Sequence, residues 1–568
     1  MPIHMKKFLS KHVPLLLTLV FGLMVFCFWG FRFPFALTYQ EQLQLFLFDS
    51  DYFVERIAEP GGLARHVAEF LVQFYNGVAI GALILAVLYM LVQRLTWRVM
   101  RSESHYNLSF IPVVMLWFAM GDESVMLTYV IALVMALAVA WGWQSWIAKC
   151  ASWVKWLSVL LMIPVMYWLI GPMVLLVAVL MSPWTLSVAG VVYSMALILL
   201  SAHFLPFPMM RVVLGISYYR IPLTLPYLLA AIPVVICLMA YVVRRLPKAK
   251  QWVNVAEVLV VLGVMAQFVD LGFDKKKYEL IAYDHLVRVG DWEGVIDRAE
   301  QHMPDLPMSV SATNLALAMT NQLGERAFDF YQHGKEGLLP PFERNFATTQ
   351  LTGEIFFHLG LVNTAQRLAF EAMEAIPNYN KSARVVKRLA ETNLINGQYK
   401  VARKYLQMLE KTVFYRPWAQ RTMALLGDEK AINAHPLYGM LRQYRLQEDF
   451  LFSDRELDKI CGLLFMHNND NQMAAQYLAM IPLMEKDLGK FMQFIPVIQK
   501  RVQYNPRHCQ EALALAFMQR RQQPPQGLVS ELTLQQMNDF ARIYSADRSS
   551  SELAKYRNTV WYYMMEGK

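Results

Sequence analysis

The sequence predicts an all-α protein in two parts: a polytopic bundle of transmembrane helices in residues 1–272 and a soluble α-solenoid in residues 273–568. Charged residues are sparse in the first part, with 17 Lys and Arg and 11 Asp and Glu, and frequent in the second, with 36 and 33. Glycine-marked turns also recur in the second part at the period of helix-turn-helix repeats. The first part therefore suits lipid and the second suits water.

Nine apolar segments of the first part are candidate membrane spans, because a bilayer core of about 30 Å needs about 20 apolar residues per helix. They cover residues 13–31, 76–93, 108–120, 125–147, 153–170, 172–186, 187–204, 222–243 and 252–270. Gly171 and Pro172 interrupt the run over residues 153–186. This run is either a hairpin, which gives nine spans, or one kinked span, which gives eight.

Basic residues indicate the orientation of these spans, since they are retained on the cytoplasmic side. Three lysines before residue 12 place the N-terminus inside. Residues 13–31 lack a small-residue cleavage site and are predicted to be a retained span rather than a signal peptide. Both alternatives put residues 32–75, the first loop, outside. Nine spans also put Arg244 and Arg245 inside and the second part outside, whereas eight would leave the second part inside. We favour nine.

The first loop is predicted to hold two amphipathic helices that lie in the membrane interface. Apolar residues recur at helical spacing over residues 43–57 and again over residues 63–74. A Pro-Gly-Gly break at residues 60–62 ends the first helix, because proline lacks a donor and glycine frees the backbone. The polar face of the second helix carries His66, Glu69 and Gln73.

Asp49 and Asp51 are the first candidate catalytic residues. On a helix Asp49 falls on the apolar side, where desolvation would raise its pKa and suit it to act as a general base, or where it would pair with a cation. Asp51 would then point into solvent. In an extended backbone the two would share a side and could bind a hard divalent metal ion. The alternative is two hydrated acidic residues at a membrane surface.

Asp122 and Glu123 are the second pair of candidate catalytic residues. They end the third span on the same side of the membrane as the first loop. Together with Asp49 they would form a carboxylate cluster, and a short hydrated turn is the alternative. Glu257 and Asp270 lie within or at the end of the last span, where buried carboxylates are functional candidates.

Residues 203–222 supply candidate substrate-binding side chains. Arginine and tyrosine suit a lipid phosphate or a sugar, because they offer bidentate cations and aromatic stacking faces. The alternative is anchoring at the membrane interface, where both residue types are common. With His66 of the first loop, the candidates are His203, Arg211, Tyr218, Tyr219 and Arg220.

The second part is predicted to be a helical repeat. Gly290, Gly324, Gly360 and Gly397 each precede an apolar helix and are spaced by 34, 36 and 37 residues, and Asp470 lies two further periods on. This period is typical of helix-turn-helix solenoids, whose surfaces bind partners. The units resemble degenerate tetratricopeptide repeats (TPR-like). We expect a protein or glycan partner on this surface.

Several function classes lack support. The sequence has no G-x-x-x-x-G-K-[ST], H-E-x-x-H or G-x-S-x-G motif, which argues against a P-loop ATPase, a zinc protease and an α/β-hydrolase. None of the five cysteines forms a C-x-x-C pair, so a zinc or thioredoxin-type site is not expected. The nearly balanced charge of the second part argues against a nucleic-acid surface.

The whole chain resembles a set of uncharacterised polytopic membrane proteins from Bacteroides-type bacteria. The matching segments are EQLQLFLFDSDYF and EPGGLARHVAEFLVQFY in the first loop, YYRIPL before a later span, and the repeat-rich tail. A looser similarity is to the GT-C class of lipid-dependent glycosyltransferases, which carry a catalytic Asp in an outer loop with two interfacial helices. This similarity implies a catalytic role for Asp49 or Asp51, a second acidic position at Asp122 and Glu123, and a lipid phosphate at Arg211 and Arg220. The sequence contains no extended signature motif of the GT-C class.

Two functions follow as hypotheses. The first is a GT-C-like transferase that moves a sugar from a polyprenyl-phosphate donor to an acceptor on the repeat domain, with the carboxylate as base or as ligand of a divalent metal. The second is a non-enzymatic, membrane-anchored TPR-like scaffold for envelope assembly. A transporter is a weaker third, since few ionisable residues fall mid-span. Either way we expect a multi-pass protein of the bacterial inner (cytoplasmic) membrane, in contact with membrane lipids, with a periplasmic C-terminal domain.

Overall fold

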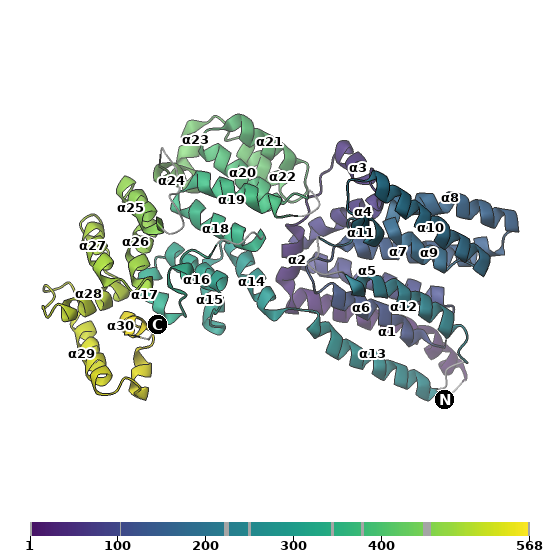
Figure 1. The fold of residues 1–568 in the computed structure, drawn as a ribbon, viewed down its shortest axis with the longest axis horizontal. Helices are drawn as coiled ribbons and strands as arrows, with labels where there is room; N and C mark the ends of the chain where they lie inside the picture. The colour runs from purple at the N-terminus through teal and green to yellow at the C-terminus, as the bar shows by residue number, and fades with distance from the viewer. Residues whose placement is uncertain are drawn as a thin grey trace. The chain divides into compact units, whose positions relative to one another are not determined.

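The computed structural model describes residues 3–102, 104–220, 226–247, 251–341, 346–376, 380–446 and 456–565. Helices are the regular elements of these residues, and among them no strand forms beyond one isolated bridge between Val125 and Tyr219. They make two compact units (Figure 1). Unit 1 comprises Met1–Tyr278, Pro377–Ala383 and Glu410–Arg416, and unit 2 comprises Glu279–Ile376, Arg384–Leu409 and Pro417–Lys568. Unit 1 thus includes two short segments from the second half of the chain.

The helices of unit 1 lie side by side with their axes nearly aligned (Figure 1). In chain order they are α1 (Ile3–Cys27), η1 (Phe28–Arg32), α2 (Pro34–Glu41), α3 (Ser50–Ile57), α4 (Gly62–Val72), η2 (Gln73–Asn76), α5 (Val78–Met100), η3 (Tyr106–Phe110), α6 (Ile111–Ala119), α7 (Leu127–Ser145), η4 (Ile147–Lys149), α8 (Ser152–Ile170), η5 (Gly171–Met173), α9 (Val174–Val179), α10 (Trp184–Phe204), α11 (Met209–Leu214), α12 (Tyr227–Val243), α13 (Gln251–Leu271) and the start of α14 (Lys275–Val289).

Among the described residues, five helical stretches of unit 1 are long and apolar enough to cross a membrane. They are Val13–Arg32, Val78–Met100, Leu127–Lys149, Ser152–Val179 and Trp184–Phe204. Shorter apolar helices cover Tyr106–Ala119, Tyr227–Val243 and Val253–Gly263. The prediction of a helical membrane protein is confirmed at this level. The side chain of Asp270, together with Lys248, Lys250 and Lys568, lies outside the described residues.

The apolar stretch Ser152–Val179 reverses direction at Gly171, whose φ of 65° is readily adopted only by glycine. Near the end of α8, the carbonyl oxygen of Trp168 accepts a hydrogen bond of 2.9 Å from the Gly61 amide of the first loop. Beyond α9, the carbonyl oxygens of Leu180 and Ser182 accept from Gln144 and Trp143, at the far end of α7. Residues 171–182 therefore run back antiparallel to α8.

Two further contacts show which helix ends of unit 1 lie near the first loop and which lie at the opposite end. At the first-loop end, the Tyr129 hydroxyl near the start of α7 donates to the carbonyl oxygen of Leu229 in the first turn of α12, at 2.7 Å. At the opposite end, the Arg244 guanidinium just after α12 donates to the carbonyl oxygen of Val99 at the end of α5, at 2.7 Å. Near their C-terminal ends, α8 and α10 are joined by a hydrogen bond between the Tyr167 and Ser201 hydroxyls, so the successive segments α7, α8, 171–182 and α10 alternate in direction.

The last helix, α13, runs from the opposite end back to the first-loop end. Near its start, the Glu257 carboxylate pairs with His105 at 2.6 Å and so does not face water as a lone charge. After its end, Gly272 touches the last turn of α6 so closely that a Cβ on Gly272 would lie 2.5 Å from the carbonyl oxygen of Phe118. Phe273 then stacks on Phe33 with ring centroids 4.5 Å apart.

The first loop differs from its sequence prediction in its first half. Residues 44–49 are extended, and the helix α3 begins only at Ser50, whereas a helix was predicted over residues 43–57. The apolar periodicity misled because Leu43, Leu45 and Phe46 are buried without being helical. The second helix, α4, is confirmed, and so is the break before it, where Gly61 is left-handed at φ 88°.

Unit 2 consists of short helices that pack as antiparallel neighbours (Figure 1). After α14 they are α15 (Trp292–Gln301), α16 (Pro307–Met319), α17 (Leu323–Arg326), η6 (Ala327–Asp329), η7 (Gly334–Gly337), α18 (Phe346–Leu359), α19 (Val362–Glu374), α20 (Ala383–Ile395), α21 (Tyr399–Glu410), α22 (Arg416–Met423), α23 (Glu429–Ala434), α24 (Pro436–Tyr444), α25 (Leu457–His467), α26 (Gln472–Met484), α27 (Leu488–Gln499), α28 (Arg507–Gln519), α29 (Glu531–Ala546), η9 (Ser551–Tyr556) and α30 (Val560–Met565).

Three of the four predicted glycine turns are present. Gly290, Gly360 and Gly397 each end a helix in the left-handed conformation, with φ of 73°, 95° and 74°. Gly324 does not, because it lies within α17 and a Cβ there would meet Pro506 at 2.4 Å. The left-handed residue of that turn is Asn321, at φ 57°. Glycine at position 324 therefore permits a close packing contact instead of a turn.

Buried ion pairs connect four helices of unit 2. Arg384 of α20 binds Asp284 of α14 at 2.8 Å, and it lies 3.6 Å from Glu354 of α18. Arg388 binds Glu354 at 2.6 Å and Glu391 at 3.0 Å, and Glu391 also accepts from Tyr438 of α24. All of these groups except Arg388 have side chains less than a tenth exposed. Such pairing requires each helix in one register, because an unpaired buried charge is costly.

Candidate functional site

The first loop is built around a buried carboxylate, Glu69 of α4. Its side chain is 1% exposed and forms ion pairs with Arg56 of α3 at 2.8 Å and with Arg65 at 3.0 Å. The Tyr52 hydroxyl also donates to Glu69. The predicted polar face of α4 is therefore not solvated, because α3 covers it and supplies the opposite charges.

The electrostatics of this cluster favour the charged form of the arginine. Burial alone would lower the pKa of the Arg56 guanidinium, but Glu69 outweighs it and raises that pKa. Burial and Glu69 together raise the pKa of Tyr52, which stays protonated and donates. Arg56 also lies over the Tyr52 ring at 4.4 Å. Arg56 therefore stays charged and Tyr52 stays protonated near neutral pH.

Arg65 extends the cluster to a segment from the second half of the chain. Its guanidinium donates to the Asn380 side-chain oxygen at 2.8 Å, across 315 residues of sequence. Asn380 belongs to the segment Pro377–Ala383 of unit 1, and its side chain is buried. One arginine thus joins Glu69 to that segment.

Asp49 binds the second such segment, Glu410–Arg416. The Lys411 ammonium lies 2.6 Å from the Asp49 carboxylate, and the Phe48 amide donates to the carbonyl oxygen of Lys411 at 2.8 Å. Tyr415 of the same segment donates to the buried Glu41 carboxylate at 3.3 Å. A main-chain bond and two side-chain contacts therefore fix this segment on the first loop.

Of the two alternatives predicted for Asp49, a pKa raised by desolvation or an ion pair with a cation, the structure has the ion pair. The residue precedes α3 instead of lying on its apolar face, and its backbone is extended. The hydrogen bond from Lys411 lowers the pKa of the Asp49 carboxyl, and burial opposes this only in part. The carboxylate therefore stays ionised and paired, as in the alternative that gave it a cation as partner.

The other candidate carboxylates have separate surroundings. Asp51 is exposed in the first turn of α3. Asp122 accepts from the Ser124 amide at 2.8 Å, and Glu123 pairs with Lys277. Over the part of the chain that the structure describes, no three His, Cys, Asp or Glu side chains are grouped to hold a metal ion. Asp49, Asp122 and Glu123, which were proposed to form one carboxylate cluster, thus each have a different partner.

The candidate substrate-binding residues after α10 are only partly brought together. Tyr218 is buried, and its hydroxyl bonds the carbonyl oxygen of Ile170 and accepts from the Met173 amide at 3.3 Å. Arg220 donates to the carbonyl oxygen of Glu123 at 2.9 Å, and Tyr219 pairs with Val125. Tyr219 and Arg220 therefore hold the segment after α11 against the turn that precedes α7, and the Tyr218 side chain holds it against the turn at Gly171.

Arg211 and the two histidines lie in different settings. The Arg211 guanidinium donates to the carbonyl oxygen of Ile216 at 2.7 Å, and burial lowers its pKa. His66 packs against the rings of Phe46 and Phe53, and burial lowers its pKa. His203 is exposed near the end of α10. His66 is therefore part of the first-loop packing, whereas His203 is not joined to it.

Sequence reasoning missed the residues that organise this site. They are Glu41, Tyr52, Arg56, Arg65, Asn380, Lys411 and Tyr415. A local signal existed for Arg65 and Glu69, which are four residues apart on one helix and can pair. No local signal existed for Asn380 or Lys411, because their partners lie more than 300 residues away.

Comparison with known proteins gives one match. The model of a family described as "Family of unknown function (DUF6057)" matches residues 10–567. No curated protein and no solved structure matches the chain. The expectation of an uncharacterised family that covers nearly the whole chain is confirmed.

Proposed function

Because this chain belongs to DUF6057, a family of unknown function, we propose a function from its own geometry: a non-enzymatic membrane anchor that holds a TPR-like helical scaffold for envelope assembly. The observation that carries the proposal is the engagement of Asp49. The carboxylate best placed by sequence for catalysis pairs with Lys411, in a segment of the second half that is part of unit 1. The first loop acts as a clamp instead of an open active site.

The clamp is supported by contacts of several kinds. Arg65 holds Asn380, the Phe48 amide holds Lys411, and Phe414 packs edge-on against Phe74 with ring centroids 5.8 Å apart. Loops are usually exposed and variable, so two inter-helix loops with buried partners need a specific role. Their proposed role is to fix the start of the scaffold to the membrane part.

The proposed topology has nine crossings, with the first loop outside and the N-terminus inside. Its support is the reversal at Gly171, the alternating helix directions, and the basic residues Arg101 and Arg244 at the end opposite the first loop. The segments Pro377–Ala383 and Glu410–Arg416 then lie outside, with the first loop that binds them. We place the protein in a bacterial inner membrane with a periplasmic C-terminal domain.

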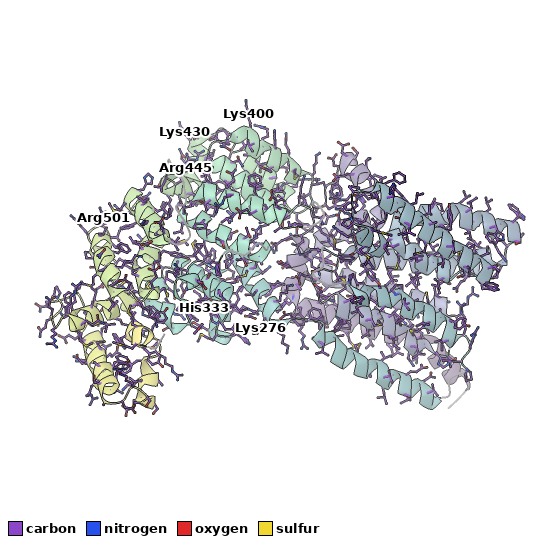
Figure 2. All side chains as sticks on the ribbon, viewed as in Figure 1. Lys276, His333, Lys400, Lys430, Arg445 and Arg501 are labelled. Carbon is purple, nitrogen blue, oxygen red and sulfur yellow. The ribbon has the colours of Figure 1, made fainter. Side chains whose placement is uncertain are left out.

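The proposed partner surface is on unit 2. Its helices pair as TPR-like units would, and solenoids of this kind bind proteins or glycans on extended surfaces. Within this unit, residues 399–409 and 417–446 carry seven Lys and Arg and two Asp and Glu. Lys400 and Lys430 point outward from α21 and α23 (Figure 2). An acidic protein or glycan would fit this surface.

A GT-C-like transferase that uses a polyprenyl-phosphate-linked sugar is the second candidate. The observation in its favour is Asp51, an exposed carboxylate two residues from Asp49. In this candidate Arg211 and Arg220 would face the lipid phosphate, and a divalent metal ion would need Asp51 together with a carboxylate released from its present partner.

A charge swap separates the two candidates. The variants are Asp49→Lys, Lys411→Asp and the double variant, with Glu55→Lys at an exposed α3 position as control. Each is reconstituted in proteoliposomes with radiolabelled polyprenyl-phosphate sugars, and protease cleavage within residues 410–416 is followed in parallel. For a clamp, each single variant accelerates cleavage, the double variant restores protection, and no variant consumes the sugar.

The opposite pattern supports the transferase. In that case wild-type protein consumes the polyprenyl-phosphate sugar, Asp49→Asn or Asp51→Asn abolishes consumption while residues 410–416 stay protected, and the charge swap restores nothing. A reversed ion pair keeps the geometry of a structural contact but removes the carboxylate from the position that a catalytic base requires.

A further inference from the structure

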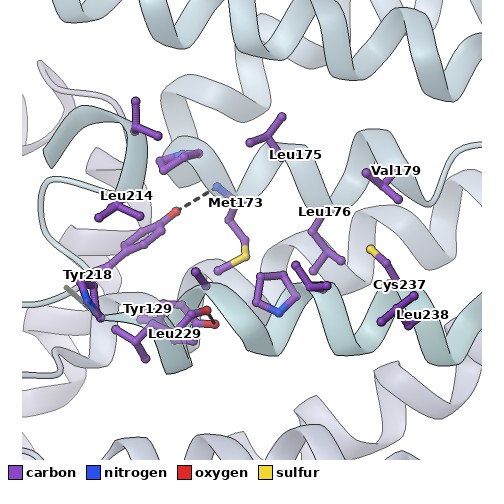
Figure 3. Close-up of a pocket in the computed structure, with 16 residues that line it drawn as sticks. Tyr129, Met173, Leu175, Leu176, Val179, Leu214, Tyr218, Leu229, Cys237 and Leu238 are labelled. Carbon is purple, nitrogen blue, oxygen red and sulfur yellow. Dashed lines mark hydrogen bonds between the residues drawn. The ribbon is translucent and has the colours of Figure 1, made fainter. Parts of the chain in front are cut away.

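An apolar cavity of about 500 Å³ lies within unit 1, between the start of α7, the short helix α9, α11 and α12 (Figure 3). This volume falls in the range of small-molecule sites. The cavity exists because α9 has only six residues and because α12 presents small or compact side chains, Ala230 and Pro233, on this side. The lining residues are Tyr129, Pro172, Met173, Leu175, Leu176, Val179, Val213, Leu214, Tyr218, Pro226, Leu229, Ala230, Pro233, Val234, Cys237 and Leu238.

The cavity wall has few free hydrogen-bonding groups for a water molecule. Two of its three polar side chains are already satisfied by main-chain groups: the Tyr129 hydroxyl donates to Leu229 at 2.7 Å, and the Tyr218 hydroxyl bonds Ile170 and accepts from Met173. The third is the Cys237 thiol, a weak donor. A stable buried water needs two to four polar partners, so an apolar occupant fits this cavity better.

The cavity opens between α9 and α12. Val179, Val234 and Leu238 line it and are also 44%, 56% and 58% exposed at the surface of these apolar helices. In a membrane this surface faces bilayer hydrocarbon. A hydrocarbon chain can therefore enter sideways without crossing water, and it restores the dispersion contacts that a void would forfeit.

The helix that borders the first-loop end of the cavity, α11, also carries a cation. Val213 and Leu214 of α11 line this end, and Arg211 is one turn earlier on the same helix. Arg211 donates to Ile216, and its charge also interacts with Tyr219 and Glu59. The apolar chain of an amphipathic molecule would contact the apolar wall, and its anionic headgroup would contact the Arg211 guanidinium. Guanidinium groups bind phosphate well.

We propose that this cavity binds one acyl chain of a bilayer phospholipid, with the phosphate at the first-loop end beside Arg211. The site lies outside the Asp49 clamp and does not depend on the scaffold function. Burial of the chain gains no hydrophobic energy relative to bilayer hydrocarbon, so shape and the headgroup contact decide occupancy. The bound lipid completes the packing of α9 against α12.

Cysteine protection tests the proposal on the wild-type protein. Cys237 lines the cavity, whereas Cys27 and Cys150 are exposed elsewhere in unit 1. Delipidated full-length protein in detergent is treated with an apolar maleimide, with and without phosphatidylglycerol, and alkylation is followed by peptide mass spectrometry. Phosphatidylglycerol is expected to slow alkylation of Cys237 about tenfold, with Cys27 and Cys150 unchanged.

A cavity-filling variant provides the second arm. Ala230→Phe is expected to abolish the protection of Cys237, whereas Val192→Phe, an exposed α10 position outside the cavity, should leave it intact. Arg211→Gln should weaken protection by phosphatidylglycerol while a neutral diacylglycerol protects both proteins equally. If Ala230→Phe does not fold, the wild-type and Arg211→Gln measurements still decide.

Three results would overturn the proposal. The first is equal protection of all three cysteines, which would indicate annular lipid only. The second is protection by polyprenyl phosphate but not by phosphatidylglycerol, which would assign the cavity to another lipid class and support the transferase instead. The third is no protection of Cys237 by any lipid. None of these outcomes bears on the scaffold proposal, except that the second favours its alternative.

Discussion

Arg384 and Asp284, one hundred residues apart in the chain, form a bidentate ion pair inside unit 2. One nitrogen of the Arg384 guanidinium donates to both carboxylate oxygens, at 2.8 and 3.0 Å, and the two side chains are 6% and 2% exposed. The pair joins α14, where unit 2 begins, to α20. A contact of this kind ties the first helix of unit 2 to a helix that follows about a hundred residues later.

Removal of the charge from one member of this ion pair should destabilise unit 2. Asp284→Asn leaves the Arg384 charge buried with only Glu354, 3.6 Å away, as an acidic partner. The expected loss is about 3 kcal/mol of unfolding free energy. Lys387→Gln, on the same helix but 40% exposed, should change stability by less than about 0.5 kcal/mol. Thermal unfolding of the full chain in detergent measures both, and equal midpoints for both variants would contradict the prediction.

Acid should weaken unit 2 in two steps. Burial lowers the pKa of His358 from 6.5 to about 4. Between pH 6.5 and about 4 the unfolded chain therefore binds a proton at His358 that the folded chain does not bind. The contribution of His358 to the unfolding free energy is fully present above pH 6.5 and is lost, by roughly 3 kcal/mol, as the pH falls to about 4. Burial alone would raise the pKa of Glu354, but Arg388 and Arg384 outweigh it and lower that pKa to about 2. Its contribution is present above pH 4.5 and is lost as the pH falls towards 2.

The His358 step is separable by mutation. His358→Gln removes the titrating group, so the midpoint of thermal unfolding should depend less on pH between 6.5 and about 4. The decline at lower pH, which belongs to Glu354, should remain. An unchanged slope in the variant would show that another group causes the first step, with His285, whose pKa burial also lowers to about 4, as the next to test.

Removal of the Glu69 charge should loosen the first loop. Glu69→Gln leaves Arg56 and Arg65 buried without their shared counter-ion, at an expected cost of about 3 to 5 kcal/mol. Glu55→Gln, which removes a 70% exposed carboxylate 3.1 Å from Arg56, should cost less than about 1 kcal/mol. Hydrogen exchange of the amides in residues 50–72 reports the difference. Equal exchange in the two variants would mean that Glu69 does not organise the loop.

The proposed topology predicts opposite results for two reporter fusions. Alkaline phosphatase fused after residue 568 should be active and a fluorescent protein there dark, because the C-terminus lies outside in the nine-crossing topology. The same reporters fused after Arg245 should give the reverse. Phosphatase activity after Arg245 together with fluorescence after residue 568 would mean eight crossings, and it would separate the second half of the chain from the first loop.

Sequence periodicity predicted the long helices well because their signal is local. The Pro-Gly-Gly break, α4, and the left-handed turns at Gly290, Gly360 and Gly397 each follow from neighbouring residues. The extended segment before Ser50 was missed because Leu43 and Phe46 are buried by tertiary contacts that mimic a helical period. Tertiary burial and helical amphipathicity give the same pattern over so few residues.

The site was harder to predict than the fold for a related reason. Asp49 pairs with Lys411, 362 residues later, and Glu69 pairs with Arg56, which a helix break separates from it. Composition shows that both signs of charge are present but not which pairs form. The apolar cavity depends on the shortness of α9, which the sequence left open as a hairpin or a kink.

The two segments that complete unit 1 set an order for biosynthesis. The last apolar helix leaves the ribosome at residue 271, but Asn380 and Lys411 follow more than a hundred residues later. At a synthesis rate of roughly 5 to 20 residues per second, the inserted helices wait several seconds or more for these partners. During that interval Arg65 and Asp49 are available to chaperones or quality-control proteases. A nascent chain that stalls before residue 411 would thus be marked as incomplete at the membrane surface, even though all of its apolar helices are already in place.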